Sequence, residues 1–60
     1  MEPTKKQKDV IESRHPNATD ITIVMGDENS FVADFRLRVK GKGNAKKRAI
    51  FDNGEIVKYF

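Results

Sequence analysis

Residues 31–40 read FVADFRLRVK, and this stretch decides the fold because apolar and polar residues alternate along it. One side collects the apolar residues Phe31, Ala33, Phe35, Leu37 and Val39, and the other collects Val32, Asp34, Arg36, Arg38 and Lys40. A period of two is that of a strand with one face in the core and the other in water. The sequence therefore predicts an antiparallel sheet that contains this strand.

The segments on either side predict three further strands. Residues 21–25 alternate with Ile21, Ile23 and Met25 on one face, and turn-forming residues 26–30 follow. Glycines at 41 and 43 provide for a reversal, after which residues 46–51 return as a third strand. A fourth strand is expected at residues 56–60. The predicted sheet is thus a four-stranded meander.

The last two strands are joined by Asn53-Gly54, a strong signal for a two-residue hairpin. Such a turn predicts four cross-strand pairs: Phe51 with Ile56, Ile50 with Val57, Ala49 with Lys58, and Arg48 with Tyr59. Two apolar sets compete for the buried side, and both are credible: Phe51, Ile56 and Phe60 against Ile50, Val57 and Tyr59. We favour the phenylalanine set as the inward one.

The N-terminal segment predicts a short helix at about residues 5–15. Thr4 is a helix-capping residue type, and Gln7 stands three positions later, as a capping box requires. Pro16 cannot continue a helix and disfavours helical geometry at the residue before it. The apolar stripe of this helix is only Val10 and Ile11, so it must dock on the sheet to be stable. The expected fold is a single α+β domain over residues 1–60, with the helix packed on the antiparallel meander.

Length and composition exclude several classes of protein. Sixty residues without cysteine make one small domain that has neither disulfides nor thiolate metal sites. No apolar run approaches the roughly 20 residues of a membrane span, so a membrane partner is not expected. The N-terminal residues lack the apolar segment of a secretory signal, which makes the cytoplasm the expected location.

Seven cations stand between residues 36 and 48 with no carboxylate among them, although the net charge is only +3. They are Arg36, Arg38, Lys40, Lys42, Lys46, Lys47 and Arg48. Residues 1–30 carry four Lys/Arg and six Asp/Glu, net −2, whereas residues 31–60 carry eight and three, net +5. A field of one sign favours encounter with a polyanion. These seven residues are the candidate binding site for a nucleic acid or another anionic partner.

Residues for catalysis are sparse. The one histidine, His15, adjoins the proline that ends the predicted helix, and no triad can be assembled around it. Asp27 and Glu28 lack the ligand spacing of a calcium loop, and Gly41-Lys42-Gly43 is not a complete phosphate-binding loop. The protein is therefore expected not to be an enzyme, and neither a cofactor, a metal nor a small-molecule substrate is indicated.

Tyr59 is the aromatic candidate for nucleic-acid contact. Its ring can stack on an unpaired base, or it can serve as an edge aromatic of the core, and both readings stay open. Phe31 and Phe35 lie on the apolar side of the predicted strand and are assigned to the core.

Two resemblances to known families bear on these expectations. The segment Gly41-Lys42-Gly43-Asn44-Ala45-Lys46-Lys47-Arg48-Ala49 resembles the Gly-x-Gly-x-Ser-Lys-Lys-x-Ala segment that opens the second helix of double-stranded-RNA-binding domains. That resemblance implies phosphate contacts by Lys46 and Lys47. The order of helix, His15-Pro16-Asn17-Ala18-Thr19 connector and strands through Phe51-Asp52-Asn53-Gly54-Glu55-Ile56-Val57 is similar to PepSY-like domains, which are generally extracytoplasmic and associated with inhibiting or regulating proteins.

Two functions are carried forward. The first is a non-enzymatic module that contacts DNA or RNA phosphates through a cationic β-ribbon, with little sequence readout. The second is an inhibitor or regulator module that engages an acidic protein through its sheet face or an exposed edge.

Overall fold

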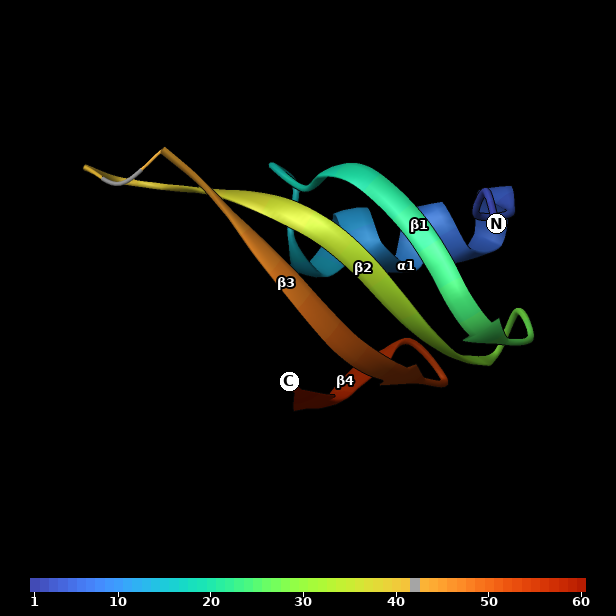
Figure 1. Cartoon of the computed structure of the whole chain (residues 1–60). Helices are drawn as coiled ribbons and strands as arrows, with labels where there is room; N and C mark the ends of the chain where they lie inside the picture. Colours follow the sequence, from blue (N-terminus) through green and yellow to red (C-terminus); the bar gives the residue numbers. More distant parts are fainter. Residues whose placement is uncertain (42) are drawn as a thin grey trace.

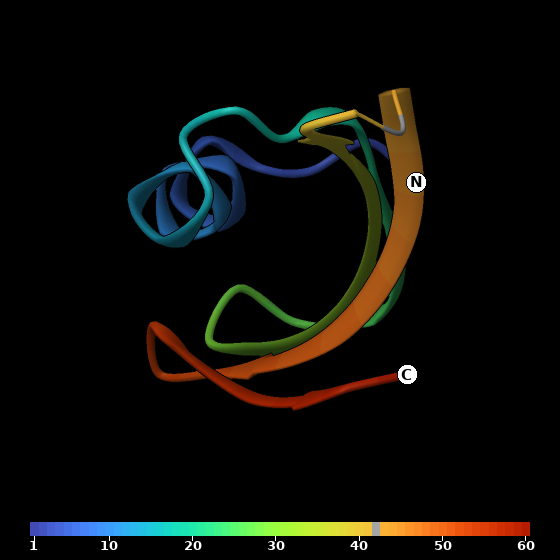
Figure 2. The same ribbon diagram turned by 90° about the vertical axis from the view of Figure 1, so that its left-hand side faces the viewer.

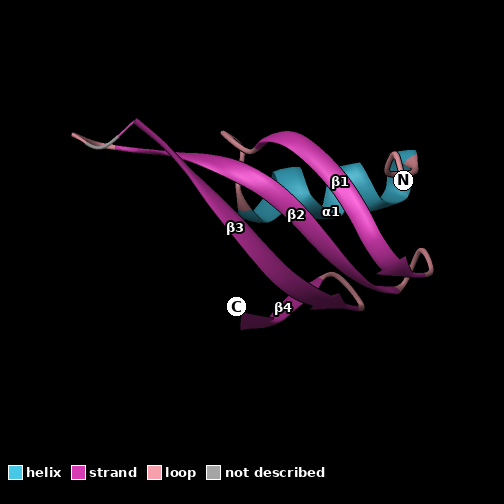
Figure 3. Ribbon diagram, viewed as in Figure 1, coloured by secondary structure: helices cyan, strands magenta, loops and turns pink. Residues whose placement is uncertain are grey.

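The computed structural model describes residues 1–41 and 43–60, so Lys42 lies outside the described residues, as does the side chain of Val39. The helix α1 (Lys5–Arg14) is followed by four strands, β1 (Thr19–Gly26), β2 (Ser30–Val39), β3 (Gly43–Asp52) and β4 (Glu55–Tyr59). The strands form one antiparallel sheet in the order β1-β2-β3-β4 (Figures 1 and 3). The predicted α+β meander is confirmed.

The helix begins and ends where the capping residues predict. Thr4 Oγ1 accepts a hydrogen bond from the backbone N–H of Gln7 at 3.2 Å, and Gln7 Oε1 accepts one from the N–H of Thr4 at 2.8 Å. At the other end, the N–H of His15 donates to the carbonyl of Ile11, and Pro16 follows. This reciprocal capping satisfies two N–H groups that the first turn would otherwise leave unpaired.

The core lies between the helix and the concave side of the sheet, which curls around α1 (Figure 2). Ile11 is the fully buried apolar residue of the helix, and it packs with side chains from three strands. These strand residues are Ile23, Phe31, Ala33, Phe35, Ala49 and Phe51. The alternation predicted for residues 31–37 is thus confirmed, with Phe31 and Phe51 stacked at a centroid distance of 5.0 Å.

The fold differs from the sequence prediction on β1. Ile21 and Ile23 face the core as expected. Met25 instead pairs with Val32, on the sheet face away from the core, and is 61% exposed. An irregularity in the pairing between Ile23 and Met25 causes this change of face, because one extra residue reverses the alternation.

An extra residue also makes part of the prediction for β4 wrong. The Asn53-Gly54 turn forms with both φ angles positive, at 50° and 84°, and Phe51 pairs with Ile56 as expected. Beyond that pair, Val57 is an extra residue, so Ile50 pairs with Lys58 and Ala49 with Tyr59. The favoured inward set is therefore wrong for Phe60, which is 66% exposed.

The turn between β1 and β2 is fixed by a close backbone approach. Gly26 has a φ of 107°, and a Cβ atom added to it would lie 2.3 Å from the carbonyl oxygen of Ser30. The Asp27 carboxylate then accepts hydrogen bonds from the backbone N–H groups of Asn29 and Ser30, at 2.8 and 2.9 Å. These contacts order the turn.

Candidate functional site

The cations of β2 and β3 are arranged by the register of the two strands. We call the stretch from Arg36 to Val39 on β2 and from Gly43 to Arg48 on β3 the basic ribbon. Arg36 is directly opposite Lys46, Arg38 is opposite Asn44, and Arg48 is opposite Asp34. These side chains share the sheet face turned away from α1, which we call the outer face, and the four cations that the basic ribbon places on it are all exposed.

The basic ribbon extends away from the rest of the molecule. The chain measures 34 Å along its longest axis and 20 by 19 Å across it. Figure 1 shows the ends of β2 and β3 reaching past β1 and α1. Both strands are 10 residues long, whereas β4 has only 5, so one end of the ribbon has no β4 neighbour.

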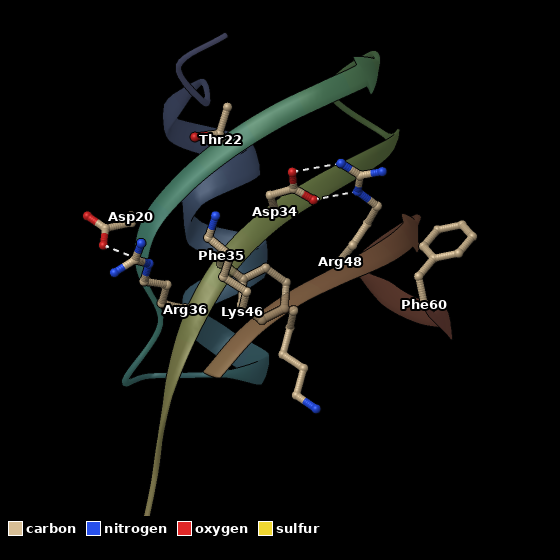
Figure 4. A pocket seen from close by; sticks show the side chains of 9 residues that line it. Asp20, Thr22, Asp34, Phe35, Arg36, Lys46, Arg48 and Phe60 are labelled. Atoms are coloured by element: carbon tan, nitrogen blue, oxygen red, sulfur yellow. Dashed lines mark hydrogen bonds and ion pairs between the residues drawn. The ribbon is translucent and has the colours of Figure 1, made fainter. Parts of the chain in front are cut away.

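Two of the outer-face arginines are held by carboxylates. Asp34 accepts hydrogen bonds from Nε and Nη2 of Arg48 at 2.6 and 3.0 Å (Figure 4). This bidentate bond lowers the pKa of Asp34 and raises that of Arg48. Arg36 Nε lies 3.6 Å from Asp20 Oδ2 of β1. The seven-cation run has no acid in its sequence, but the sheet places two beside it.

The remaining candidate cations are distributed unevenly. Arg38 and Lys46 are on the outer face, and no described carboxylate lies within 4 Å of either charged group. Lys47 pairs with Phe35 and therefore belongs to the face that carries the core. Lys40 lies in the turn after β2, and Lys42 falls outside the described residues. The structure thus brings together four of the seven predicted residues, Arg36, Arg38, Lys46 and Arg48, on one face.

An open groove of about 620 Å³ crosses the outer face between β1 and β4 (Figure 4). The Arg36–Asp20 and Arg48–Asp34 ion pairs both line it, and Phe60 lines it on the β4 side, near Arg48. The residues that line it are Asp20, Thr22, Asp34, Phe35, Arg36, Lys46, Lys47, Arg48 and Phe60. Sequence reasoning missed Phe60 and Asp20 as members of this surface, because both reach it through irregularities in strand pairing.

Tyr59 lies on the other side of the sheet from this groove. Its hydroxyl is 2.7 Å from Nε2 of His15, and the two rings meet edge to face at 6.0 Å. The His15 ring in turn lies 5.5 Å from Phe35. Tyr59 therefore connects β4 to the end of α1, and a role in base stacking stays a prediction for it.

A row of apolar side chains crosses the outer face. Met25, Val32 and Ile50 stand in one row across β1, β2 and β3, as the strand register places them. The outer face therefore changes from this apolar row on the side of the β1–β2 turn to cationic toward the far end of the basic ribbon. A partner that covers both parts has to offer an apolar surface to the first and negative charge to the second.

Comparisons with family models, with curated proteins and with solved structures find no match to this chain. Within residues 1–41 and 43–60, no helix is long and apolar enough to cross a membrane. Among the same residues, no group of three or more His, Asp or Glu side chains is placed to hold a metal ion.

Proposed function

We propose that the protein binds nucleic acids by contacting their phosphates with the outer face of the basic ribbon. One observation carries this proposal: Arg36 and Lys46 stand side by side, with Arg38 one row further along the same face. Alternate residues of a strand are about 7 Å apart, so these rows can meet successive phosphates of one backbone. Phosphate contact of this kind carries little sequence information.

The acids on the same face set the character of this binding. Arg48 uses two of its five N–H groups on Asp34, which leaves three for another acceptor. Asp20 and Asp34 offset half of the four outer-face cations of the basic ribbon, so these six side chains carry a net charge of +2. We therefore expect modest affinity that weakens steeply as salt rises.

The test is fluorescence anisotropy with labelled DNA and RNA, single-stranded and duplex, across a salt series. Each phosphate neutralised gives a slope of about −0.9 in log K against log salt for duplex DNA and about −0.7 for single strands. We expect two to four such contacts. Reversing two charges, with Arg38→Glu and Lys46→Glu together, should weaken binding at least tenfold. The salt slope should become shallower by the amount that about two phosphate contacts contribute.

Lys5→Glu is the control for a single reversal, because Lys5 is exposed on α1, away from the basic ribbon. Arg38→Glu and Lys46→Glu, each made singly, should weaken binding more than this control does. Circular dichroism should show that all variants are equally folded. Equal losses at both places would show that only net charge matters. Absence of binding to every nucleic acid at low salt would refute the proposal.

A second candidate function is binding to an acidic protein as an inhibitor or regulator. The apolar row favours it, since Met25 exposes a large side chain next to Val32 and Ile50. Such a partner would cover both the apolar and the cationic parts of the outer face. A complex that survives nuclease treatment would separate this function from the first.

A further inference from the structure

Phe60 is an exposed aromatic residue on a charged surface. It is 66% exposed and lines the groove, while its backbone N–H donates to the carbonyl of Arg48 at 2.8 Å. The extra residue at Val57 turns Phe60 to the outer face, where regular alternation would have turned it inward. The backbone of Phe60 is thus held against β3.

We propose that this groove binds an unpaired base of a single-stranded nucleic acid, with Phe60 as the stacking platform. This inference rests on the proposed function and names its ligand class. The ring of Phe60 offers a face for stacking, and it cannot read hydrogen-bonding edges, so the base is selected by accessibility rather than by identity. A base inside a duplex presents no such face.

The neighbouring cations suit the backbone that carries the base. Arg36 and Lys46 line the same groove one row away, about 7 Å along the strands. Arg38 is a further row away in the same direction. A single strand with its base against Phe60 can therefore run along the basic ribbon, with its next phosphates over these rows.

Two charged groups beside Phe60 strengthen this arrangement. The Arg48 guanidinium is fixed by its two bonds to Asp34, so it lines the groove as an oriented plane on which a base can also stack. Lys58 Nζ lies over the Phe60 ring, 5.6 Å from its centre, so the base stacks on the ring face that this ammonium does not cover. This ammonium adds a phosphate contact at the β4 side of the groove.

Tyr59, the aromatic residue first considered for this role, is already engaged. Its hydroxyl is bonded to His15 on the helix side of the sheet, whereas Phe60 has no polar atom on its ring and faces the cations. Stacking is thereby assigned to Phe60.

The experiment uses the intact chain with a tryptophan reporter, because the natural sequence has none. Phe60→Trp retains an aromatic platform, and a stacked base should quench its fluorescence. Val57→Trp is the matched control, since Val57 is 63% exposed on the same strand but does not line the groove. The probes are an eight-nucleotide oligothymidylate, an abasic strand with the same number of phosphates, and a duplex of the same length.

We expect the oligothymidylate to quench Phe60→Trp and to leave Val57→Trp nearly unchanged, with the abasic strand and the duplex quenching neither. In anisotropy measurements, Phe60→Ala should weaken oligothymidylate binding by roughly 5- to 150-fold. The same variant should leave binding of the abasic strand unchanged.

The outcomes separate this inference from the proposed function. Equal binding of the abasic strand and the oligothymidylate, unaffected by Phe60→Ala, would overturn base stacking while leaving phosphate binding in place. Tighter binding of the duplex than of the single strand would likewise overturn base stacking and leave phosphate binding in place. If no probe binds at low salt, both proposals are refuted.

Discussion

Gln7 is a polar side chain that is only 4% exposed, and both ends of its amide are occupied. Oε1 accepts from the N–H of Thr4, which closes the capping box, and Nε2 donates to the carbonyl of Asp27 at 3.0 Å. The sequence predicts the first bond from the spacing of Thr4 and Gln7. The second joins α1 to the β1–β2 turn, 20 residues away, and no local pattern reveals it.

Gln7→Glu isolates the second bond, because glutamate serves a capping box as well as glutamine does. The new oxygen would face the Asp27 carbonyl oxygen where a donor now lies. We expect a loss of about 1–3 kcal/mol in the free energy of unfolding at neutral pH. Part of this loss should be recovered in acid, where a protonated carboxyl can donate. Urea unfolding measures both.

Lys8→Gln, at an exposed neighbouring position, is the control and should change stability by less than about 0.5 kcal/mol. Wild-type stability of the Gln7→Glu variant would show that the bond to the turn contributes nothing.

The β1–β2 turn is an element whose stability depends on pH. Hydrogen bonds from the N–H groups of Ser30 and Asn29 lower the pKa of Asp27. The bond from Arg48 likewise lowers the pKa of Asp34 on the adjacent strand. A carboxyl whose pKa is lower in the folded than in the unfolded chain stabilises the fold above the unfolded pKa, and it loses this contribution as pH falls through the folded one.

We therefore expect the free energy of unfolding to decrease below about pH 4. Asp27→Asn keeps one acceptor oxygen but removes the titration, so it should make this decrease shallower without abolishing it, since Asp34 still titrates. Urea unfolding at intervals from pH 6 to 3 measures the slope. Glu28→Gln, at the exposed next residue, should retain the wild-type slope. An unchanged slope in Asp27→Asn would contradict the assigned role.

The elements themselves were largely predictable. Strict alternation identifies β2, and the Asn53-Gly54 turn identifies the last hairpin. The errors arise at Met25 and Phe60, each of which follows an extra residue in a strand. Such an insertion depends on how two strands pair, so the sequence of one strand does not reveal it.

The candidate site was predicted only in part for related reasons. Period-two alternation within β3 already separates Lys47 from Lys46 and Arg48, so this division could have been read from the sequence. Asp20 joins Arg36 only because β1 pairs with β2, and that proximity is a tertiary fact.

At the scale of the whole molecule, one helix residue provides the fully buried apolar contact between the two layers. Ile11 is fully buried against the sheet, and Val10 is only partly buried beside it. A domain of this size has a total stability of about 3–9 kcal/mol. The contribution of Ile11 is therefore a large share of the total.

Ile11→Ala should cost about 2–5 kcal/mol. Because the concave face of the sheet packs against α1, we expect the sheet amides and the helix amides to lose protection together in hydrogen exchange. Val57→Ala removes an exposed side chain and should have little effect. Loss of helix protection with the sheet still protected would show that the strands are stable without α1.

The sequence by itself determined the helix with its cap, the four strands, the hairpin turn and the concentration of cations between residues 36 and 48. All of these depend on local spacing, capping and alternation, which act between residues close in the chain. Only the tertiary structure decided which cations share a face, which acids hold Arg36 and Arg48, and that Phe60 rather than Tyr59 lines the groove. Those outcomes depend on strand register and on two extra residues, and register is fixed by packing between distant segments.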